Sequence, residues 1–308
     1  MRFATVATGA VNGYLAVKLA QSGGDVACLA RGAHRDAIRA RGLKLREADG
    51  ETVVRIKAVS EDPAALGPAD VVIFAVKGQD LDAVAPMVKP LLGPETFVIP
   101  LLNGVEAAGR LEAHLGEGRV LEGYCAISVF IPEPGVIART GGFAKFRFAE
   151  RDGTRSERAL RAADALTGAG IDAGVPEDIQ RELWLKFLML ASMSGVTAAA
   201  RCTAGQIRAS AELTRLTAEA VAEVGRLARA EGVAITEADE ARTVEAIKAM
   251  PAQMRASQAM DLTAGRSLEV DWLSGAVARL SEAQGLEAPV HRALHAVLSP
   301  FKAGGAKG

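Results

Sequence analysis

Short apolar runs alternate with amphipathic stretches through the first half of the chain, so strands and helices are expected in turn. The runs at residues 2–7 and 25–30 are apolar and rich in strand-forming residues. The stretch between them, "TGAVNGYLAVKLAQSG", has apolar residues at helical spacing and stops at Gly23 and Gly24. A strand, a glycine turn, a helix and a second strand form a βαβ unit, which implies a parallel sheet.

Longer apolar runs extend this pattern. Residues 69–77 and 96–104 have the uninterrupted apolar character of strands that are buried on both faces. Residues 79–92, between them, predict a helix, and short strands are expected at residues 119–132 and 144–150. We therefore expect an α/β fold with a doubly wound sheet of the Rossmann type, which binds ligands at the carboxyl ends of its strands.

Helical periodicity replaces the strand pattern from about residue 176 onwards. Pro176, followed by two acidic residues, predicts the start of a helix that runs through Lys186 towards residue 200. Further helical stretches are expected at residues 211–232, 237–250, 256–285 and 288–301. The second domain is therefore expected to be all-α. Turn-forming residues near 168–177 place the border between domains of residues 1–172 and 173–308.

The stretch at residues 256–285 is expected to hold two helices with a break near Gly265. Ser267 is a suitable N-cap for the second of these helices, because a serine oxygen can accept from the amides of a first turn. Glu269 and Asp271 would then lie in that first turn, where acidic side chains are favoured.

Composition narrows the function classes. The 308 residues are 49% hydrophobic with a net charge of −1, so nothing indicates the basic surface that nucleic-acid binding requires. No run approaches the ~20 apolar residues of a membrane span, and the N-terminus has no signal-peptide pattern. Cys28, Cys125 and Cys202 show no metal or redox spacing, which favours a reduced, cytoplasmic location. His291 and His295 have no acidic or cysteine partner nearby in the sequence, so no metal site is expected.

The turn after the first expected strand matches a dinucleotide-binding fingerprint only in part. Glycines would be expected at positions 7, 9 and 12, where the chain has Ala7, Gly9 and Asn12, followed by Gly13. Ala7 costs little if its φ is negative, whereas Asn12 must fit where the helix usually carries no side chain. Backbone amides at a helix N-terminus still offer an anion site, although a plain βα turn explains the motif equally well. The candidate cofactor-binding residues are Ala7, Thr8, Gly9, Ala10, Val11 and Asn12.

Arg31 follows the second expected strand, at the position where NAD enzymes commonly have an acidic residue that binds the ribose 2′-hydroxyl. A guanidinium there matches the 2′-phosphate of NADP in both charge and geometry. Arg35 would add to the positive field. An exposed arginine that binds no ligand is the alternative interpretation.

Lys186 interrupts an almost unbroken run of large apolar residues, "RELWLKFLML". Because lysine is rarely buried, two explanations compete. In the first, the side chain extends to solvent, paired with Glu182 one turn earlier. In the second, it is a catalytic amine whose proton affinity is tuned by its surroundings.

Taken in order, the motifs of the chain resemble those of the ketopantoate reductase (2-dehydropantoate 2-reductase) family over residues 1–301. The matching stretches are "LARGAH", "VIFAVKGQD", "PLLNGVE", "ELWLKF" and "SQAMDLTAGRSLEVDWLSG". The resemblance implies a Rossmann domain followed by a helical domain like the C-terminal domain of 6-phosphogluconate dehydrogenase. It also implies NADPH-dependent reduction of a small 2-keto acid in a cleft between the domains, as in pantothenate biosynthesis. A homodimer is common in the family.

The resemblance also assigns roles to single residues. Lys186 matches the lysine that protonates the substrate carbonyl oxygen as the hydride arrives, and Glu269 matches a glutamate beside that lysine and the nicotinamide. Asn103 matches an asparagine that contacts both cofactor and substrate. Arg31 matches the arginine that binds the 2′-phosphate. The remaining matches are Lys77, near the nicotinamide ribose, and Ser257, which binds the substrate.

Two positions on the helix expected to carry Lys186 depart from the ketopantoate reductase family. The family commonly has asparagines there that hydrogen-bond the substrate. They are Leu190, which can neither donate nor accept a hydrogen bond, and Ser194, which we retain as a substrate-binding candidate. The loss of one polar contact can change selectivity strongly. Three functions therefore stay open: reduction of 2-dehydropantoate to pantoate, the same chemistry on a more apolar carbonyl compound, and nucleotide binding without catalysis, which Ala7 and Asn12 suggest.

Overall fold

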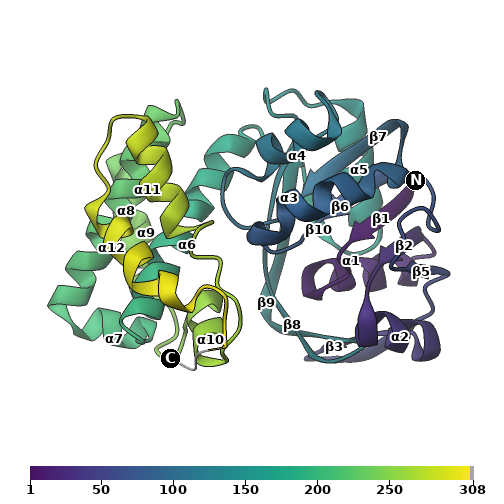
Figure 1. Cartoon of the computed structure of the whole chain (residues 1–308), viewed down its shortest axis with the longest axis horizontal. Coiled ribbons are helices and arrows are strands. Elements are labelled where there is room, and N and C mark those ends of the chain that lie inside the picture. The colour runs from purple at the N-terminus through teal and green to yellow at the C-terminus, as the bar shows by residue number, and fades with distance from the viewer. Residues whose placement is uncertain (306–308) are drawn as a thin grey trace. The chain divides into compact units, whose positions relative to one another are not determined.

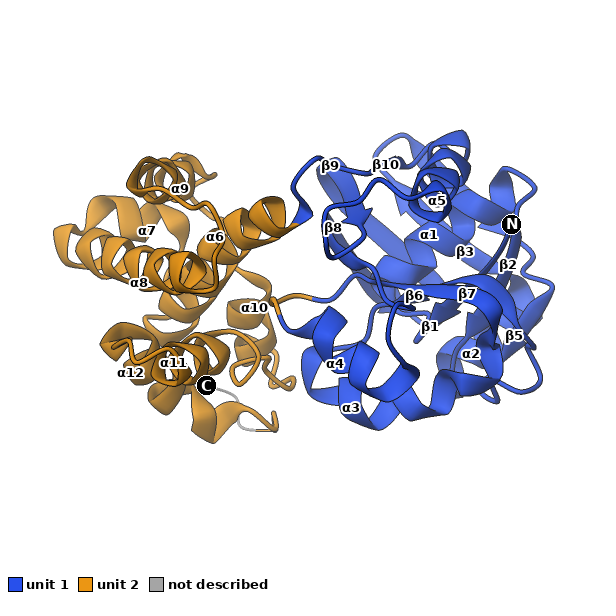
Figure 2. Cartoon of the chain, turned by 90° about the horizontal axis from the view of Figure 1, so that it is seen from above, with its two compact units in different colours: residues 1–102, 106–179 blue, residues 103–105, 180–308 orange. Residues whose placement is uncertain are grey.

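The structure, a computed structural model, describes residues 1–305 and divides into two compact units (Figure 2). Residues 1–102 and 106–179 form the first, which we call the sheet unit. Residues 103–105 and the chain from residue 180 form the second, the helical unit. The division at residue 179 lies beyond the border at residue 172 that we expected, because β10 (Asp172–Gly174) pairs with a strand of the sheet unit.

A five-stranded parallel sheet forms the centre of the sheet unit, and it confirms the predicted Rossmann-type architecture. Its strands lie in the order β5-β2-β1-β6-β7. Their bounds are Arg2–Val6 for β1, Asp25–Leu29 for β2, Ala58–Ser60 for β5, Ala69–Phe74 for β6 and Leu92–Pro100 for β7. Val6 pairs with Leu29 on one side and with Phe74 on the other, so the three central strands end at the same edge.

Helices connect these strands, with one exception to the sequence prediction. The regular helices are α1 (Ala10–Gln21), α2 (Gly32–Arg41) and α4 (Ala107–Leu115). The prediction of a single helix at residues 79–92 is wrong. Short pieces replace it, namely η1 (Gly78–Asp80), α3 (Leu81–Val84) and η2 (Ala85–Leu91). Pro86 and Pro90 have no amide hydrogen to donate, so a continuous α-helix is not favoured there.

A second sheet contacts α1 as well, so this helix has a sheet on each side (Figure 1). The strands are β10, β9, β3 and β4 in that order, with β8 paired to β9. The bounds are Leu43–Glu47 for β3, Gly50–Val54 for β4, Glu122–Glu133 for β8 and Val136–Ala149 for β9. Helix α5 (Glu157–Gly168) follows. The strands expected at residues 119–132 and 144–150 therefore belong mainly to this sheet, although Val120 also forms a parallel bridge with Val98 of β7.

The helical unit is all-α, as the periodicity predicted, and no helix in residues 1–305 is long and apolar enough to cross a membrane. Its helices are α6 (Ile179–Ala199), α7 (Ala204–Ala209), α8 (Ala211–Ala230), α9 (Glu237–Ala249), α10 (Ser257–Thr263), α11 (Ser274–Ala283), α12 (Pro289–Leu298) and η3 (Ser299–Phe301). The first begins at Ile179 and not at Pro176, with Glu182 as the acidic residue of its first turn.

The N-cap prediction for Ser267 is wrong, because α11 begins only at Ser274. Residues 264–273 form turns and irregular backbone, and we call this segment the Glu269 loop. Leu268 and Val270, on either side of Glu269, are buried at 3% and 0% exposure. The burial of these two apolar side chains therefore overrides the local preference for a capped helix.

Ala7 has a left-handed backbone conformation, with a φ of +54°, in the turn between β1 and α1. The condition under which alanine would cost little here, a negative φ, is therefore not met. A Cβ atom makes the left-handed conformation unfavourable by about 1 kcal/mol, a cost that glycine does not have. Residue 7 nevertheless has the left-handed conformation that glycine, the fingerprint residue at this position, adopts without this cost.

We expect Ala7→Gly to raise the free energy of unfolding by up to about 1 kcal/mol, because it relieves the left-handed strain more than it loosens the unfolded chain. Chemical denaturation measures this change. Ala40 is the matched control, since it is exposed and helical in α2. Ala40→Gly should lower the free energy by roughly 0.5–1 kcal/mol. An equal loss in both variants would contradict strain at Ala7.

Candidate active site

Candidate cofactor-binding residues lie at the carboxyl edge of the parallel sheet. The turn of Ala7 to Asn12 follows β1, Arg31 follows β2, and Lys77 follows β6. These three strands are neighbours in the sheet. The chain moves from β1 to β2 on one side and returns to β6 on the other. Ligands bind doubly wound sheets at this kind of reversal.

Asn12, which replaces the last glycine of the fingerprint, is fully buried beneath the turn. Its Nδ2 donates to the main-chain oxygens of Val6 and Ala7, at 2.6 Å and 3.3 Å. A third bond reaches the main-chain oxygen of Ile73 on β6, at 3.4 Å. The asparagine therefore fits, and it links the ends of β1 and β6 in a way that glycine could not.

Thr8 and two glycines determine the rest of this turn. The amide of Thr8 donates to the main-chain oxygen of Leu29 at the end of β2, at 2.8 Å. A Cβ added to Gly9 would meet only the oxygen of Ala7, at 3.7 Å, so there is room above the backbone. A Cβ added to Gly13 would lie 2.5 Å from Cδ1 of Ile137 on β9. Gly13 therefore allows close packing of α1, the role expected of a glycine at position 12.

Arg31 and Arg35 differ in their surroundings. Arg35 forms ion pairs with Asp36 and Glu61, each with an N–O distance of 2.7 Å, and these carboxylates offset its charge. Arg31 is exposed at the start of α2 and has no ion pair with any of residues 1–305. The guanidinium of Arg31 is therefore the better placed of the two to bind a phosphate.

The turn and Arg31 together fit a dinucleotide. Helix α1 has 12 residues and no acidic side chain in its first turn, so its N-terminal amides favour an anion. The room above Gly9 would admit a pyrophosphate, and the guanidinium of Arg31 would suit a further phosphate group. These features concern the sheet unit alone.

In the helical unit, Asn103 joins a cation and an anion. Nζ of Lys186, on α6, donates to Oδ1 of Asn103 at 3.1 Å. Nδ2 of Asn103 donates to Oε2 of Glu269 at 3.2 Å. The amide accepts at its oxygen and donates from its nitrogen, so these two partners fix its orientation. The structure thus brings together three residues that the sequence analysis singled out.

Trp272 and Gly104 complete this group, although the sequence analysis did not assign either a role. The indole Nε1 of Trp272 donates to the main-chain oxygen of Asn103. Gly104 has a φ of +86°, and a Cβ there would lie 2.6 Å from the same Nε1. A tryptophan N–H that leaves solvent needs an acceptor, so the tryptophan in "EVDWLSG" was an available signal. The acceptor itself lies far away in the sequence.

The candidate substrate residues are less closely associated. Lys186, Leu190 and Ser194 are four residues apart on α6, which places them along one helical face over about 12 Å. Ser194 is fully buried, and its hydroxyl has no hydrogen-bond partner among the described residues. Ser257 is exposed at the start of α10. No hydrogen bond within the described part of the chain joins either serine to Lys186 or Glu269.

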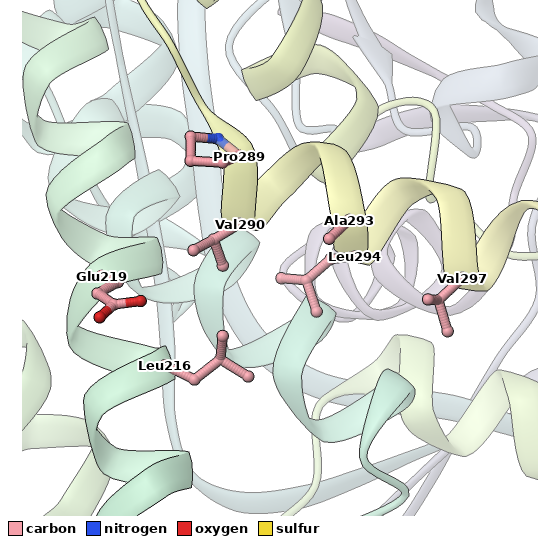
Figure 3. A pocket seen from close by; sticks show the side chains of 7 residues that line it. All are labelled: Leu216, Glu219, Pro289, Val290, Ala293, Leu294 and Val297. Carbon is pink, nitrogen blue, oxygen red and sulfur yellow. The ribbon is translucent and has the colours of Figure 1, made fainter.

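A hollow elsewhere in the helical unit does not suit a keto acid (Figure 3). It lies between α8 and α12 and is lined by Leu216, Glu219, Pro289, Val290, Ala293, Leu294 and Val297. Its one ionisable side chain is a carboxylate, which would repel an acidic substrate. Residues 1–305 also contain no group of three or more His, Cys, Asp or Glu side chains placed to hold a metal ion.

Comparison with known proteins identifies the family of the chain. Residues 3–153 match the family model described as ketopantoate reductase PanE/ApbA, and residues 178–302 match the model of its C-terminal domain. A crystal structure of a PanE/ApbA family ketopantoate reductase from Ralstonia eutropha has 28% sequence identity and a TM-score of 0.90. That similarity covers 98% of both chains.

Two curated relatives agree with this result. A 2-dehydropantoate 2-reductase from Mesorhizobium japonicum is 31% identical, with 91% of both proteins covered. The uncharacterized oxidoreductase YkpB from Bacillus subtilis is 30% identical over 98% of this chain and 99% of its own length. Together with the fold and the two family models, these similarities show that the chain belongs to the ketopantoate reductase family of oxidoreductases.

Proposed function

We propose that this protein reduces a 2-keto acid to a 2-hydroxy acid with NADPH, with 2-dehydropantoate as the first candidate substrate and pantoate as its product. The observation that carries this proposal is the bonded chain from Lys186 through Asn103 to Glu269. It holds a lysine amine in place on a rigid 21-residue helix. A snorkelling lysine would not need such a partner.

In this proposal the sheet unit binds the cofactor. The amides that begin α1 would hold the pyrophosphate above Gly9, Arg31 would bind the 2′-phosphate, and Lys77 would lie near the nicotinamide ribose. When bound, NADPH would supply a hydride to the carbonyl carbon of the substrate. A guanidinium in place of an acidic residue after β2 supports NADPH over NADH.

Lys186 would stabilise the negative charge that develops on the substrate oxygen and then donate a proton to it. An ammonium has three N–H donors, and Asn103 takes one of them. The bond to Asn103 limits rotation of the amine and so preserves its direction. Glu269 acts through the same amide, because it fixes which end of Asn103 faces the lysine.

The bonds of Asn12 remove the sequence-based reason for regarding the turn as degenerate; they bear on nucleotide binding and not on catalysis. A degenerate turn would lose the contacts that shape it. Here the substituted residue adds bonds to Val6, Ala7 and Ile73, which support the turn between β1 and α1 where the dinucleotide would bind. Contacts to the turn and to β6 therefore compensate for the departure from the glycine fingerprint.

Leu190 supports a second candidate substrate, a 2-keto acid with an apolar side chain. It lies one turn after Lys186 on the same face of α6, where the family commonly has an asparagine. A leucine offers contact area but no hydrogen bond. A substrate with a hydroxyl near that position would lose its partner, whereas an alkyl or aryl group would gain a favourable contact.

We expect Lys186→Ala to lower kcat by about 10²–10⁴-fold, the usual contribution of general acid catalysis, while NADPH binding stays the same. NADPH absorbance with 2-dehydropantoate and a panel of other 2-keto acids measures turnover. Lys248→Ala, which removes a surface lysine of α9 that pairs with Glu245, is the control. Wild-type binding of NADPH without oxidation by any substrate would refute the reductase. Full turnover by Lys186→Ala would refute the lysine's role.

Arg31→Ala should raise the Kd for NADPH by about 10–100-fold, because a charge-assisted bond to phosphate is worth about 1.5–3 kcal/mol. The Kd for NADH, which has no 2′-phosphate, should change by less than about twofold. Fluorescence titration measures both constants. Arg39→Ala removes the same charge from an exposed position later in α2 and should change neither. Equal losses for the two cofactors would reject Arg31 as the 2′-phosphate ligand.

Leu190→Asn tests the choice between the two substrate classes. If leucine limits use of 2-dehydropantoate, the variant should raise kcat/KM for it by about 10-fold, the value of one good hydrogen bond. The same change should lower kcat/KM for an apolar 2-keto acid. Steady-state kinetics gives the ratio of the two kcat/KM values, 2-dehydropantoate over the apolar 2-keto acid. If this ratio is the same in Leu190→Asn and in the wild type, other residues set the selectivity.

A further inference from the structure

The Glu269 loop holds two of the groups that contact Asn103, yet it has no regular helix or strand of its own. Glu269 accepts from the Asn103 side chain, and Trp272 donates to the Asn103 main chain. Irregular backbone is held by tertiary contacts or is mobile. Both contacts to Asn103 therefore depend on whatever fixes this loop from outside.

Asp271, between these two residues, is held by two basic side chains from the end of the chain. Nε2 of His295, on α12, lies 2.6 Å from Oδ1 of Asp271. Nζ of Lys302 donates to Oδ2 at 3.0 Å. Partial burial alone would raise the pKa of Asp271, but the bonds from His295 and Lys302 outweigh it and lower the pKa. Each oxygen of the carboxylate thus has its own cationic or hydrogen-bonding partner.

The backbone of the C-terminal segment adds further contacts to the same loop. The amide of Leu268 donates to the main-chain oxygen of Lys302 at 3.0 Å, and the amide of Gly305 donates to that of Gly265 at 2.9 Å. A Cβ on Gly275, just after the loop, would lie 2.8 Å from the ring of His295. The C-terminal segment therefore lies along the loop with little space between them.

We propose that Asp271, held by His295 and Lys302, is a positioning residue for the chain of Glu269, Asn103 and Lys186. It does not touch the reacting atoms. It keeps Glu269 and Trp272 at the spacing at which both contact Asn103, and Asn103 in turn directs the amine of Lys186. The expected effect of Asp271 on kcat rests on the proposed function, whereas its expected effect on the position of the Lys186 amine does not.

A surface ion pair with no such role would behave differently. Exposed pairs contribute only about 0–1 kcal/mol to stability, and their removal leaves activity unchanged. Asp271 and Lys302 have half-exposed side chains, each 55% accessible, so stability alone gives little reason for three charged or polar groups to meet here. A large change in kcat with a small change in Tm separates positioning from stability.

The experiment compares Asp271→Ala, Asp271→Asn and Lys302→Met with the control Lys248→Met in the full-length protein. Asp271→Ala should lower kcat about tenfold, with the Kd for NADPH and the Tm close to those of the control. Asp271→Asn keeps an acceptor for His295 and should recover part of the loss. Lys302→Met should give an intermediate kcat, because the bond from His295 stays. If all three variants keep kcat within twofold of the control, the proposal is wrong.

Labelling of Lys186 provides a test that needs no turnover. Acetic anhydride at a fixed pH acylates lysine amines. Peptide mass spectrometry gives the rate of acylation at Lys186 and at Lys248 of the wild-type protein. In Asp271→Ala, the rate at Lys186 should change at least threefold while the rate at Lys248 stays constant. This change without turnover in the wild type would support positioning and refute the reductase. Unchanged labelling of Lys186 would overturn the proposal.

Discussion

The amide of Asn103 is the interaction on which the candidate chemistry depends. An uncharged side chain with an acceptor at one end and a donor at the other can bind a cation and an anion at the same time. Lys186 and Glu269 are both mobile, charged side chains, and each loses much of its freedom through this one group. The indole of Trp272 then fixes the main chain of the same residue. Side-chain and main-chain contacts thus act on a single position.

The parallel sheet was predictable because its strands are apolar on both faces, as the run in β6 shows. The second sheet was missed at β3 and β4, because "LKLRE" and "GETVV" are short and half-exposed, with only a few apolar positions. The prediction of Ser267 as an N-cap followed the known preference for serine at that position, but the burial of Leu268 and Val270 determined the backbone there. In each case a tertiary contact, invisible in the local pattern, decided the structure.

The candidate site shows the same limit. Lys186 was noticed as a lone lysine in an apolar run, but Asn103 and Glu269 were joined to it only through the resemblance to a family, since nothing in the local sequence of each residue indicates the other two. The left-handed conformation of Ala7 could not be inferred, because alanine normally avoids it. The fit of Asn12 also had no sequence signal, since one of its acceptors, Ile73 on β6, is 61 residues away in the chain. The conformation of this turn can therefore be kept although alanine and asparagine replace two of its usual glycines.

Residues 103–105 belong to the helical unit, although the chain on both sides of them belongs to the sheet unit. The boundary between the units in space is thus not a single boundary in the sequence. A recombinant fragment starting at residue 180 would contain Lys186, Glu269 and Trp272 but would lack the residue that they share. The helical unit therefore cannot be obtained whole by one cut at residue 180. A fragment that holds both the amine and its orienting amide must begin at or before Asn103, and it then also carries residues 106–179 of the sheet unit.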